Sequence, residues 1–366
     1  VIMLIVNKSL IILSIILIII IIHYNSCINY NLLYKDITKL DIYNPYNNTL
    51  LLQSSIKSYS DQVLLFKNNS IVFTLYNPLS SNLIETMSIT KSIVGLAILF
   101  LIQDNKINSI NDKISQYIIL WKNTDKENIT IKDILNMSSY LKNDWEYQHY
   151  RKKTNNFLTM SLNIKTKTNT NTTPKTFEYN NFAIQILPTL VHILTSTHID
   201  NYLNIKLFKP LNIKYYWYKD NYNMPFAPSG LHLNIDGLFK IGKLILNNGS
   251  YDNKIIIKPQ LLDNFLNINI NHNDVEKSKT ITNKYMKCSY GNLFWLCQDN
   301  ESNIINNDNI VLWGYGGQYL IINKNKNVIG IRLKNLSYFI ENNYDENNYF
   351  VKGSKHFFFD NFITYI

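Results

Sequence analysis

Residues 88–102 read Ser-Ile-Thr-Lys-Ser-Ile-Val-Gly-Leu-Ala-Ile-Leu-Phe-Leu-Ile and carry the strongest structural signal in the chain. The last ten of these residues include no polar side chain. We therefore expect a helix over Met87–Gln103 that is buried on every side. Because residues three apart share one face of a helix, Lys91 can reach the hydroxyl of Ser88.

A serine hydroxyl becomes a good nucleophile only when a base removes its proton. Lysine can do this where burial lowers its pKa, and the start of a helix favours the negative charge that develops. The pattern predicts Ser88 as nucleophile and Lys91 as its base. The other interpretation is that Ser88 only caps a helix, since Ser54 and Lys57 repeat the spacing without a long apolar helix behind them.

A second pattern, Tyr179-Asn180-Asn181, stands directly before the apolar run Phe182–Leu187. A tyrosine beside a Ser/Lys pair can relay a proton to a leaving group, and an asparagine can orient the lysine or the substrate. We expect Tyr179 to be the third catalytic residue and Asn181 to contact substrate or the oxyanion.

A third pattern, Trp-Gly-Tyr-Gly-Gly-Gln at residues 313–318, leads into a predicted strand. Glycines let a substrate approach the backbone, and an N–H at the strand edge can help to form an oxyanion hole. The candidates are Gly314, Tyr315 and Gly316. The alternative is a tight turn with no role in chemistry.

The remaining elements indicate a mixed α+β domain. A hairpin is predicted from Gln62–Phe66 and Ser70–Tyr76. Helices are predicted over Ile129–Asn136, where Thr130 opens the helix, and over Asp236–Leu246. A helix over Phe182–Leu194 is expected to be interrupted by Pro188. Another helix is expected to end within Leu207–Leu211, where a proline stops it. Strands are predicted over Leu293–Cys297, Gln318–Asn323 and Val328–Lys334, the last two pairing antiparallel. Residues 152–175 show little pattern and are interpreted as a surface loop or an insertion. Strands at both ends with helices between them predict terminal strands that share one sheet.

Six matches, which follow one another along the chain in the same order as in the family, resemble the serine β-lactamases, penicillin-binding proteins and related esterases. Ser88–Ser92 is similar to the first motif of that family, and Phe177–Asn181 to its Tyr-x-Asn motif. Gly314–Gln318 resembles the third motif of the class C-like esterases and the hydrolases of 6-aminohexanoate oligomers. The supporting segments are Ile129–Ser139, Leu207–Ile213, and Ser229–Leu238 with Leu246–Gly249.

The resemblance runs from about residue 55 to about residue 335 and implies a fold, a reaction and a site. The fold is an antiparallel sheet flanked by helices, plus a mostly helical lobe at about 105–215. The reaction is an attack by Ser88 on a carbonyl, with Lys91 and Tyr179 managing protons, through an acyl-enzyme that water releases. The oxyanion would be held by the N–H of Ser88 and one near Tyr315.

The chain departs from the family at three places. Its third motif lacks the Lys-Thr-Gly of true β-lactamases, which favours an ester or amide hydrolase. Tyr140 and Asn212 stand where the family usually has glycine. The alternatives are a catalytically silent membrane protein of this family and a D,D-peptidase of the penicillin-binding type.

The N-terminus indicates where the protein works. Leu10–Ile22 is an apolar run broken only by Ser14, and it predicts a signal peptide or membrane anchor within residues 1–30. Lys8 precedes this run, and no other lysine or arginine follows until Lys35. The positive-inside rule therefore places the main domain outside the cytoplasm, anchored or secreted. Residues 31–50 are interpreted as a linker, and residues 51–366 as the hydrolase domain.

The charge and the cysteine and histidine content indicate which kinds of partner to expect. Of 36 basic residues only Arg151 and Arg332 are arginines, and the net charge is +10. The lysines are scattered rather than striped, so we expect no nucleic-acid partner. No Cys/His spacing predicts a metal, and no cofactor is expected. The expected substrate is a small ester, amide or peptide. Cys288 and Cys297 either pair or stay as two buried thiols.

Overall fold

The computed structural model describes residues 39–143, 151–167, 176–266, 286–299 and 309–336. By its internal contacts the chain divides into a short unit, residues 1–41, and a large unit, residues 42–366. The N-terminal segment predicted to be a signal peptide or anchor lies outside the described residues. Within the described ranges, no helix has both the length and the apolar composition needed to cross a bilayer.

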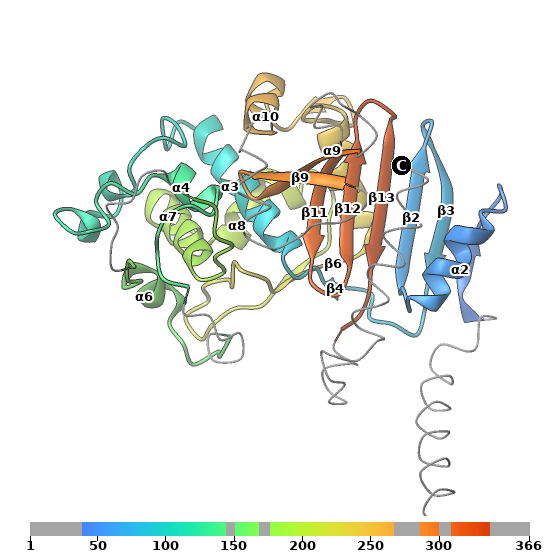
Figure 1. Cartoon of the computed structure of the whole chain (residues 1–366), viewed down its shortest axis with the longest axis horizontal. Helices are drawn as coiled ribbons and strands as arrows, with labels where there is room; N and C mark the ends of the chain where they lie inside the picture. The colour runs from blue at the N-terminus through green and yellow to red at the C-terminus, as the bar shows by residue number, and fades with distance from the viewer. Residues whose placement is uncertain (1–38, 144–150, 168–175, 267–285, 300–308, 337–366) are drawn as a thin grey trace, which may run out of the picture. The chain divides into compact units, whose positions relative to one another are not determined.

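An eight-stranded sheet is the centre of the large unit (Figure 1). Its spatial order is β1-β3-β2-β13-β12-β11-β10-β9, and all neighbouring pairs from β3 to β9 are antiparallel. The strands are β1 (Asp41–Tyr43), β2 (Gln62–Lys67), β3 (Ser70–Tyr76), β9 (Met286–Gly291), β10 (Phe294–Asp299), β11 (Asn309–Gly314), β12 (Gln318–Asn323) and β13 (Val328–Leu333).

The pairing of β2 with β13 joins the two ends of the domain, which confirms that the terminal strands share one sheet. The predicted hairpin of β2 and β3 is also confirmed. Its turn residues Asn68 and Asn69 have φ of 52° and 61°, a left-handed conformation that two-residue hairpin turns require and asparagine tolerates. Every residue of β12 and β13 is buried, so both faces of the sheet are covered there.

Apart from α2 (Thr49–Lys57), which lies between β1 and β2, the helices occupy the sequence between β3 and β9. They are α3 (Ile89–Gln103), α4 (Ile131–Leu135), α6 (Phe157–Leu162), α7 (Ile186–Thr195), α8 (Ile199–Leu203), α9 (Ile235–Leu246) and α10 (Pro259–Leu266). Shorter helical turns are η2 (Ile114–Gln116), η3 (Ile119–Trp121), η4 (Ala183–Gln185) and the π-helical η5 (Asn204–Phe208). Figure 1 shows α3, α4, α6, α7 and α8 gathered beside the β9–β11 end of the sheet.

Helix α3 is the predicted buried helix, and all its residues from Ile89 to Leu101 are buried. It packs on β11 and β12 and comes so close to the β9–β10 turn that Gly95 is required. A Cβ added there would lie 2.8 Å from the backbone oxygen of Asn292. The start of α3 is therefore held firmly beside the end of the sheet.

Helix α9 covers one face of the sheet with its apolar side. An Asn234 side chain accepts from the N–H of Gly237 and caps the helix start. Gly242 packs on Leu320 and Ile329, where an added Cβ would meet side-chain carbons at 3.1–3.3 Å. The predicted Asp236–Leu246 helix is confirmed and contributes core, not chemistry.

Two predictions about helices were wrong. Pro188 does not interrupt its helix, because it lies in the first turn of α7, where backbone N–H groups have no acceptor within the helix. Residues 152–175 are not wholly loop, since α6 forms within them. Asn156 caps α6 by accepting from the N–H of Thr159.

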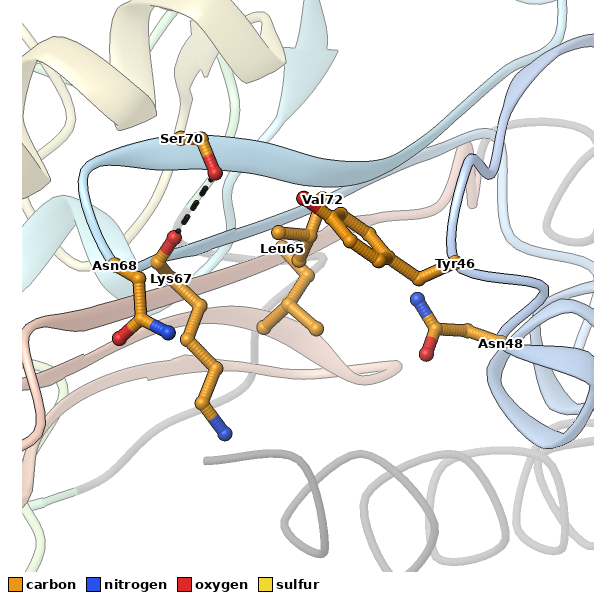
Figure 2. Close-up of a pocket in the computed structure, with 7 residues that line it drawn as sticks. All are labelled: Tyr46, Asn48, Leu65, Lys67, Asn68, Ser70 and Val72. Atoms are coloured by element: carbon orange, nitrogen blue, oxygen red, sulfur yellow. Dashed lines mark hydrogen bonds between the residues drawn. The ribbon is translucent and has the colours of Figure 1, made fainter.

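The segment interpreted as a linker, residues 31–50, contains secondary structure in its described part. Strand β1 occupies Asp41–Tyr43, and α2 begins at Thr49. A pocket of about 260 Å³ lies between the start of α2 and the β2–β3 hairpin, with Tyr46 and Asn48 facing Leu65 and Val72 (Figure 2). None of the predicted catalytic residues lines it.

Small elements connect the sheet to the helical region. Strands β4 (Ile84–Glu85), β6 (Leu231–Leu233) and β5 (Tyr216–Trp217) form a three-stranded sheet, and β7 (Ser250–Tyr251) pairs with β8 (Lys254–Ile255). Cys288 and Cys297 are directly paired residues of β9 and β10 and form a disulfide. Of the two alternatives for these cysteines, the structure has the bonded pair.

Candidate active site

Ser88 stands at the junction between β4 and α3. It is the residue before the first turn of α3, yet its side chain makes no capping hydrogen bond. The interpretation of Ser88 as a simple helix cap is therefore wrong. Met87, directly before it, has φ of 51°, a conformation that costs a non-glycine residue about 1–3 kcal/mol. Such strain is typical of a position that must present a side chain.

Lys91 lies one helical turn further along, with its side chain buried under Ser88. Its Nζ is 2.8 Å from Ser88 Oγ and donates to the carbonyl oxygen of Pro228 at 2.7 Å. Burial lowers the pKa of Lys91 to about 7, because the charged form loses its hydration. At neutral pH a large share of this amine is unprotonated and able to accept a proton.

Tyr179 completes the group. Its hydroxyl lies near enough to Ser88 for that side chain to influence its pKa, and Lys91 Nζ lies 5.1 Å from the centre of its ring. Burial raises the pKa of Tyr179 to about 12, and the nearby Ser88 hydroxyl acts in the opposite direction. The phenol thus keeps its proton at neutral pH, and it can donate it.

An aromatic cluster fixes the ring of Tyr179. Trp295 stacks on it at 6.5 Å between ring centres and 13° between planes, and Tyr290 contacts it edge-on at 6.2 Å. Tyr290 and Trp295 in turn pack on each other at 4.7 Å and on Phe177. Burial and the nearby Tyr179 raise the pKa of Tyr290 well above its ordinary value.

The two asparagines after Tyr179 differ in role. Asn180 is buried, donates to the carbonyl oxygen of Leu141 at 2.8 Å and accepts from the N–H of Ala183, so it holds the loop. Asn181, the predicted substrate contact, is half-buried, and no hydrogen bond within the described residues engages its side chain.

The glycine-rich turn reaches the same place from the sheet. Gly314 ends β11 so close to β4 that an added Cβ would lie 2.4 Å from the carbonyl oxygen of Thr86, two residues before Ser88. Gly316 and Gly317 have φ of 74° and 82°, values that favour glycine. Tyr315, between them and Gly314, is 46% exposed. The structure thus brings the third predicted pattern beside the first.

Sequence reasoning missed the residues that brace this site. Arg151 binds the carboxylate of Glu85 through two contacts of 2.9 Å, and Glu85 also accepts from the N–H of Gly230. This ties the strand that leads to Ser88 to the loop whose Pro228 carbonyl receives Lys91. A local signal did exist: Arg151 is one of only two arginines among 36 basic residues.

The two positions where family glycines are replaced keep the glycine conformation. Tyr140 has φ of 55° and Asn212 has φ of 49°. The loops therefore retain their course despite the substitutions. In the described part of the chain, no group of three or more His, Cys, Asp or Glu side chains is placed to hold a metal ion.

Comparison with known proteins shows which family and which fold this chain resembles. Residues 55–232 match the family model described as Beta-lactamase. Protein flp of Staphylococcus aureus strain MRSA252 is 29% identical over 143 residues, which are 38% of this chain and 28% of that protein. In strain MW2 the identity is 29% over 154 residues, 41% of this chain and 31% of that protein. The match thus spans less than a third of the length of these curated relatives.

Solved structures share the fold at low identity. A protein of Bacillus anthracis assigned as a 6-aminohexanoate-dimer hydrolase gives a TM-score of 0.67 at 17% identity, covering 86% of this chain and 80% of that one. A family VIII carboxylesterase gives 0.62 at 14%, covering 81% and 94%. A penicillin-binding protein from Bacillus halodurans gives 0.58 at 14%, covering 78% and 95%. Over residues 55–232, just under half of its length, this chain is therefore similar to the β-lactamase family, and it shares the fold of these solved structures.

Proposed function

We propose that this chain is a serine hydrolase that cleaves ester or amide bonds through an acyl-enzyme on Ser88. The observation that carries the proposal is the 2.8 Å contact between Lys91 Nζ and Ser88 Oγ, made by an amine whose pKa burial lowers to about 7. A base poised near the working pH combines the right protonation state with a useful driving force for proton transfer.

In the first half of the reaction, Ser88 Oγ forms a bond to the carbonyl carbon of the substrate while its proton passes to Lys91. The carbonyl π electrons move onto oxygen. Collapse of this intermediate breaks the bond to the leaving group, which takes a proton from Tyr179, and Tyr179 recovers one from Lys91. Water then repeats the sequence on the acyl group and frees Ser88.

The Pro228 carbonyl has a part in this scheme. A neutral amine has two N–H donors and one lone pair, and its contact with Pro228 oxygen uses one donor. That contact turns the lone pair toward Ser88. Loss of the Pro228 contact would leave the amine free to rotate away from the hydroxyl.

The oxyanion would be held by two backbone N–H groups. Ser88 precedes the first turn of α3, so its N–H has no acceptor within the helix. The second donor is assigned to the turn near Tyr315, which the close approach of Gly314 to Thr86 brings alongside. Two such donors in a water-poor site would supply several kcal/mol of transition-state stabilisation.

The substrate class follows from the third motif and from similar proteins. The turn Gly314–Gln318 carries no lysine, so it offers no cation for the carboxylate of a β-lactam. Proteins with this fold include a carboxylesterase and a protein assigned as a 6-aminohexanoate-dimer hydrolase. We assign small esters or amides as substrates, with Asn181 as a polar contact to them.

For location, we propose a membrane-anchored or secreted protein whose domain lies outside the cytoplasm. The apolar run Leu10–Ile22 supports attachment through the N-terminus. The Cys288–Cys297 disulfide supports an oxidising compartment, where such bonds persist. Flotation of the full chain with lipid vesicles, with and without residues 1–30, tests the attachment.

Hydrolysis of short p-nitrophenyl esters and anilides by the purified chain tests the activity. Turnover by the wild-type chain, lost in Ser88→Ala and kept in Ser54→Ala, is the expected result. Ser54 is the matched control because it has the same spacing to a lysine, and its hydroxyl donates to the Leu51 carbonyl oxygen. Equal turnover by Ser88→Ala would overturn the proposal, and an inactive wild-type chain would favour a silent family member.

A further inference from the structure

Arg332 is fully buried beneath the glycine-rich turn that follows β11. It lies on β13, opposite Tyr319 of β12, on the sheet face away from α9. Its Nη1 donates to the carbonyl oxygens of Gly316 and Gly317 at 3.2 and 2.6 Å. We propose that Arg332 is a positioning residue for the oxyanion turn, a role that rests on the proposed function.

The other donors of Arg332 tie it to the chain that follows α2. Nη2 donates to the carbonyl oxygen of Ser58 at 2.8 Å, and Nε donates to Ser60 Oγ at 2.7 Å. Ser58 is the C-terminal cap of α2. One guanidinium therefore bridges the end of α2 and the tip of the β11–β12 hairpin, with all four of these acceptors being neutral oxygens.

Because peptide groups are planar, the contacts of Arg332 with the Gly316 and Gly317 carbonyls also restrict the directions of the N–H groups in this turn. In a trans peptide the N–H and C=O point in opposite directions. The carbonyl of Gly314 accepts from the N–H of Gly317 at 3.2 Å, so the N–H of Tyr315, on the same peptide as that carbonyl, is directed to the other side. By holding Gly316 and Gly317, Arg332 fixes the orientation of this whole turn.

The turn needs such a brace because glycines make it soft. Gly316 and Gly317 adopt φ values of 74° and 82°, and glycine backbone moves easily between conformations. At the start of β12, the Gln318 side chain makes two hydrogen bonds with the backbone of Lys334. Leu336 packs against Gly316, where an added Cβ would lie 2.5 Å from a side-chain carbon. Arg332 contributes the contacts to the turn carbonyls.

Lysine cannot replace this arginine. An ammonium group is a single point with three donors, whereas a guanidinium spreads five donors over a planar fork. The chain uses lysine at all but two of its 36 basic positions, so an arginine here stands out against the composition. The other arginine, Arg151, also forms a two-contact bridge, to Glu85 before Ser88.

Arg332→Lys tests the assignment through kinetics and backbone exchange. We expect kcat for a p-nitrophenyl ester to fall about 10- to 100-fold, because an oxyanion donor is misplaced, while KM stays within about 3-fold. The midpoint of the pH–rate profile should remain near the Lys91 value, since Lys91 keeps its surroundings. Amide hydrogen exchange in a peptide over residues 311–318 should become faster, and exchange in α3 should not change.

Arg151→Lys is the matched control for exchange, because it makes the same chemical change away from the turn and should leave residues 311–318 as protected as in the wild type. Ser60→Ala removes the Nε acceptor and also the hydroxyl that bonds Ser58 Oγ. It serves if Arg332→Lys fails to fold, and it should make exchange in the same peptide faster and lower kcat about 3- to 10-fold. Wild-type kcat and wild-type exchange in both variants would overturn the inference. If the wild-type chain has no turnover, the proposed function fails, while exchange still decides whether Arg332 holds the turn.

Discussion

Lys91 Nζ lies 2.8 Å from Ser88 Oγ, one turn into a helix that is buried on every side. The same apolar surroundings that make α3 a core helix also lower the pKa of Lys91 to about 7. The burial of Lys91 therefore affects both the free energy of unfolding and the ability of its amine to act as a base. Both the pH dependence of the rate and the stability of the chain should reflect this lowered pKa.

The pH dependence of acylation follows from Lys91. Because the unprotonated amine is the base, the acylation rate should rise with pH through about 7 and level off above about 8. Stopped-flow measurement of the burst from an activated ester gives this profile. A rate that falls with rising pH across this interval would contradict the assigned protonation states.

Lys91→Met should abolish turnover yet stabilise the fold at pH 7. The folded-state pKa of Lys91 is about 7 and the unfolded value about 10.4, so between these pH values the unfolded chain binds more protons and stability rises with pH. At pH 7 the lowered pKa of Lys91 reduces the free energy of unfolding of the wild-type chain by about 4–5 kcal/mol. The Lys91→Met variant is free of this cost, but it loses the hydrogen bond to Pro228, which is a loss of about 1–3 kcal/mol.

Urea unfolding of both proteins measures the difference. The variant should be about 1–4 kcal/mol more stable at pH 7. This advantage should shrink as the pH approaches 10.4, because Lys91 then becomes neutral in the unfolded chain as well. The same stability difference at pH 7 and pH 10 would show that Lys91 keeps its ordinary pKa.

Tyr179→Phe should lower kcat about 100- to 10,000-fold, because the proton donor to the leaving group is lost. Its ring contacts with Trp295 and Tyr290 remain, so the free energy of unfolding should change by less than about 1–2 kcal/mol. Tyr290→Phe is the matched control: it removes a neighbouring phenol and should lower kcat less than 10-fold. Comparable losses in both variants would remove the special role of Tyr179.

Removal of the Cys288–Cys297 disulfide should lower the free energy of unfolding by about 2–3 kcal/mol, the value expected for closing a loop of this length. Urea unfolding of a Cys288→Ser/Cys297→Ser chain measures it. The wild-type chain under dithiothreitol should show the same loss. Unchanged stability in both conditions would mean that the strand pairing of β9 and β10 needs no covalent support.

Local sequence patterns predicted the elements that are set by interactions between neighbouring residues. Thr130 caps α4 in a full capping box with Asp133, and the Asn68–Asn69 turn closes the β2–β3 hairpin. Patterns failed where a rule has a positional exception, as for Pro188 in a first helical turn. They also missed α6, a helix of six residues within a Thr/Asn/Lys-rich stretch.

The site was predictable only in part, for a similar reason. Ser88 and Lys91 are three residues apart on one helix, so their contact could be inferred from spacing. The carbonyl of Pro228, 137 residues after Lys91, carries no side-chain signal at all. Arg332 meets Gly316 and Gly317 only because β12 and β13 pair in one register. Such long-range partners follow from the fold and not from any local motif.

The most direct test of the account is to locate the covalent adduct. The purified chain is treated with a fluorophosphonate probe, digested, and sequenced by tandem mass spectrometry. A single adduct on Ser88, absent after Lys91→Met, is the predicted result. An adduct on another residue, or undiminished labelling of Ser88 in the Lys91 variant, would contradict the claim that this buried amine activates this hydroxyl.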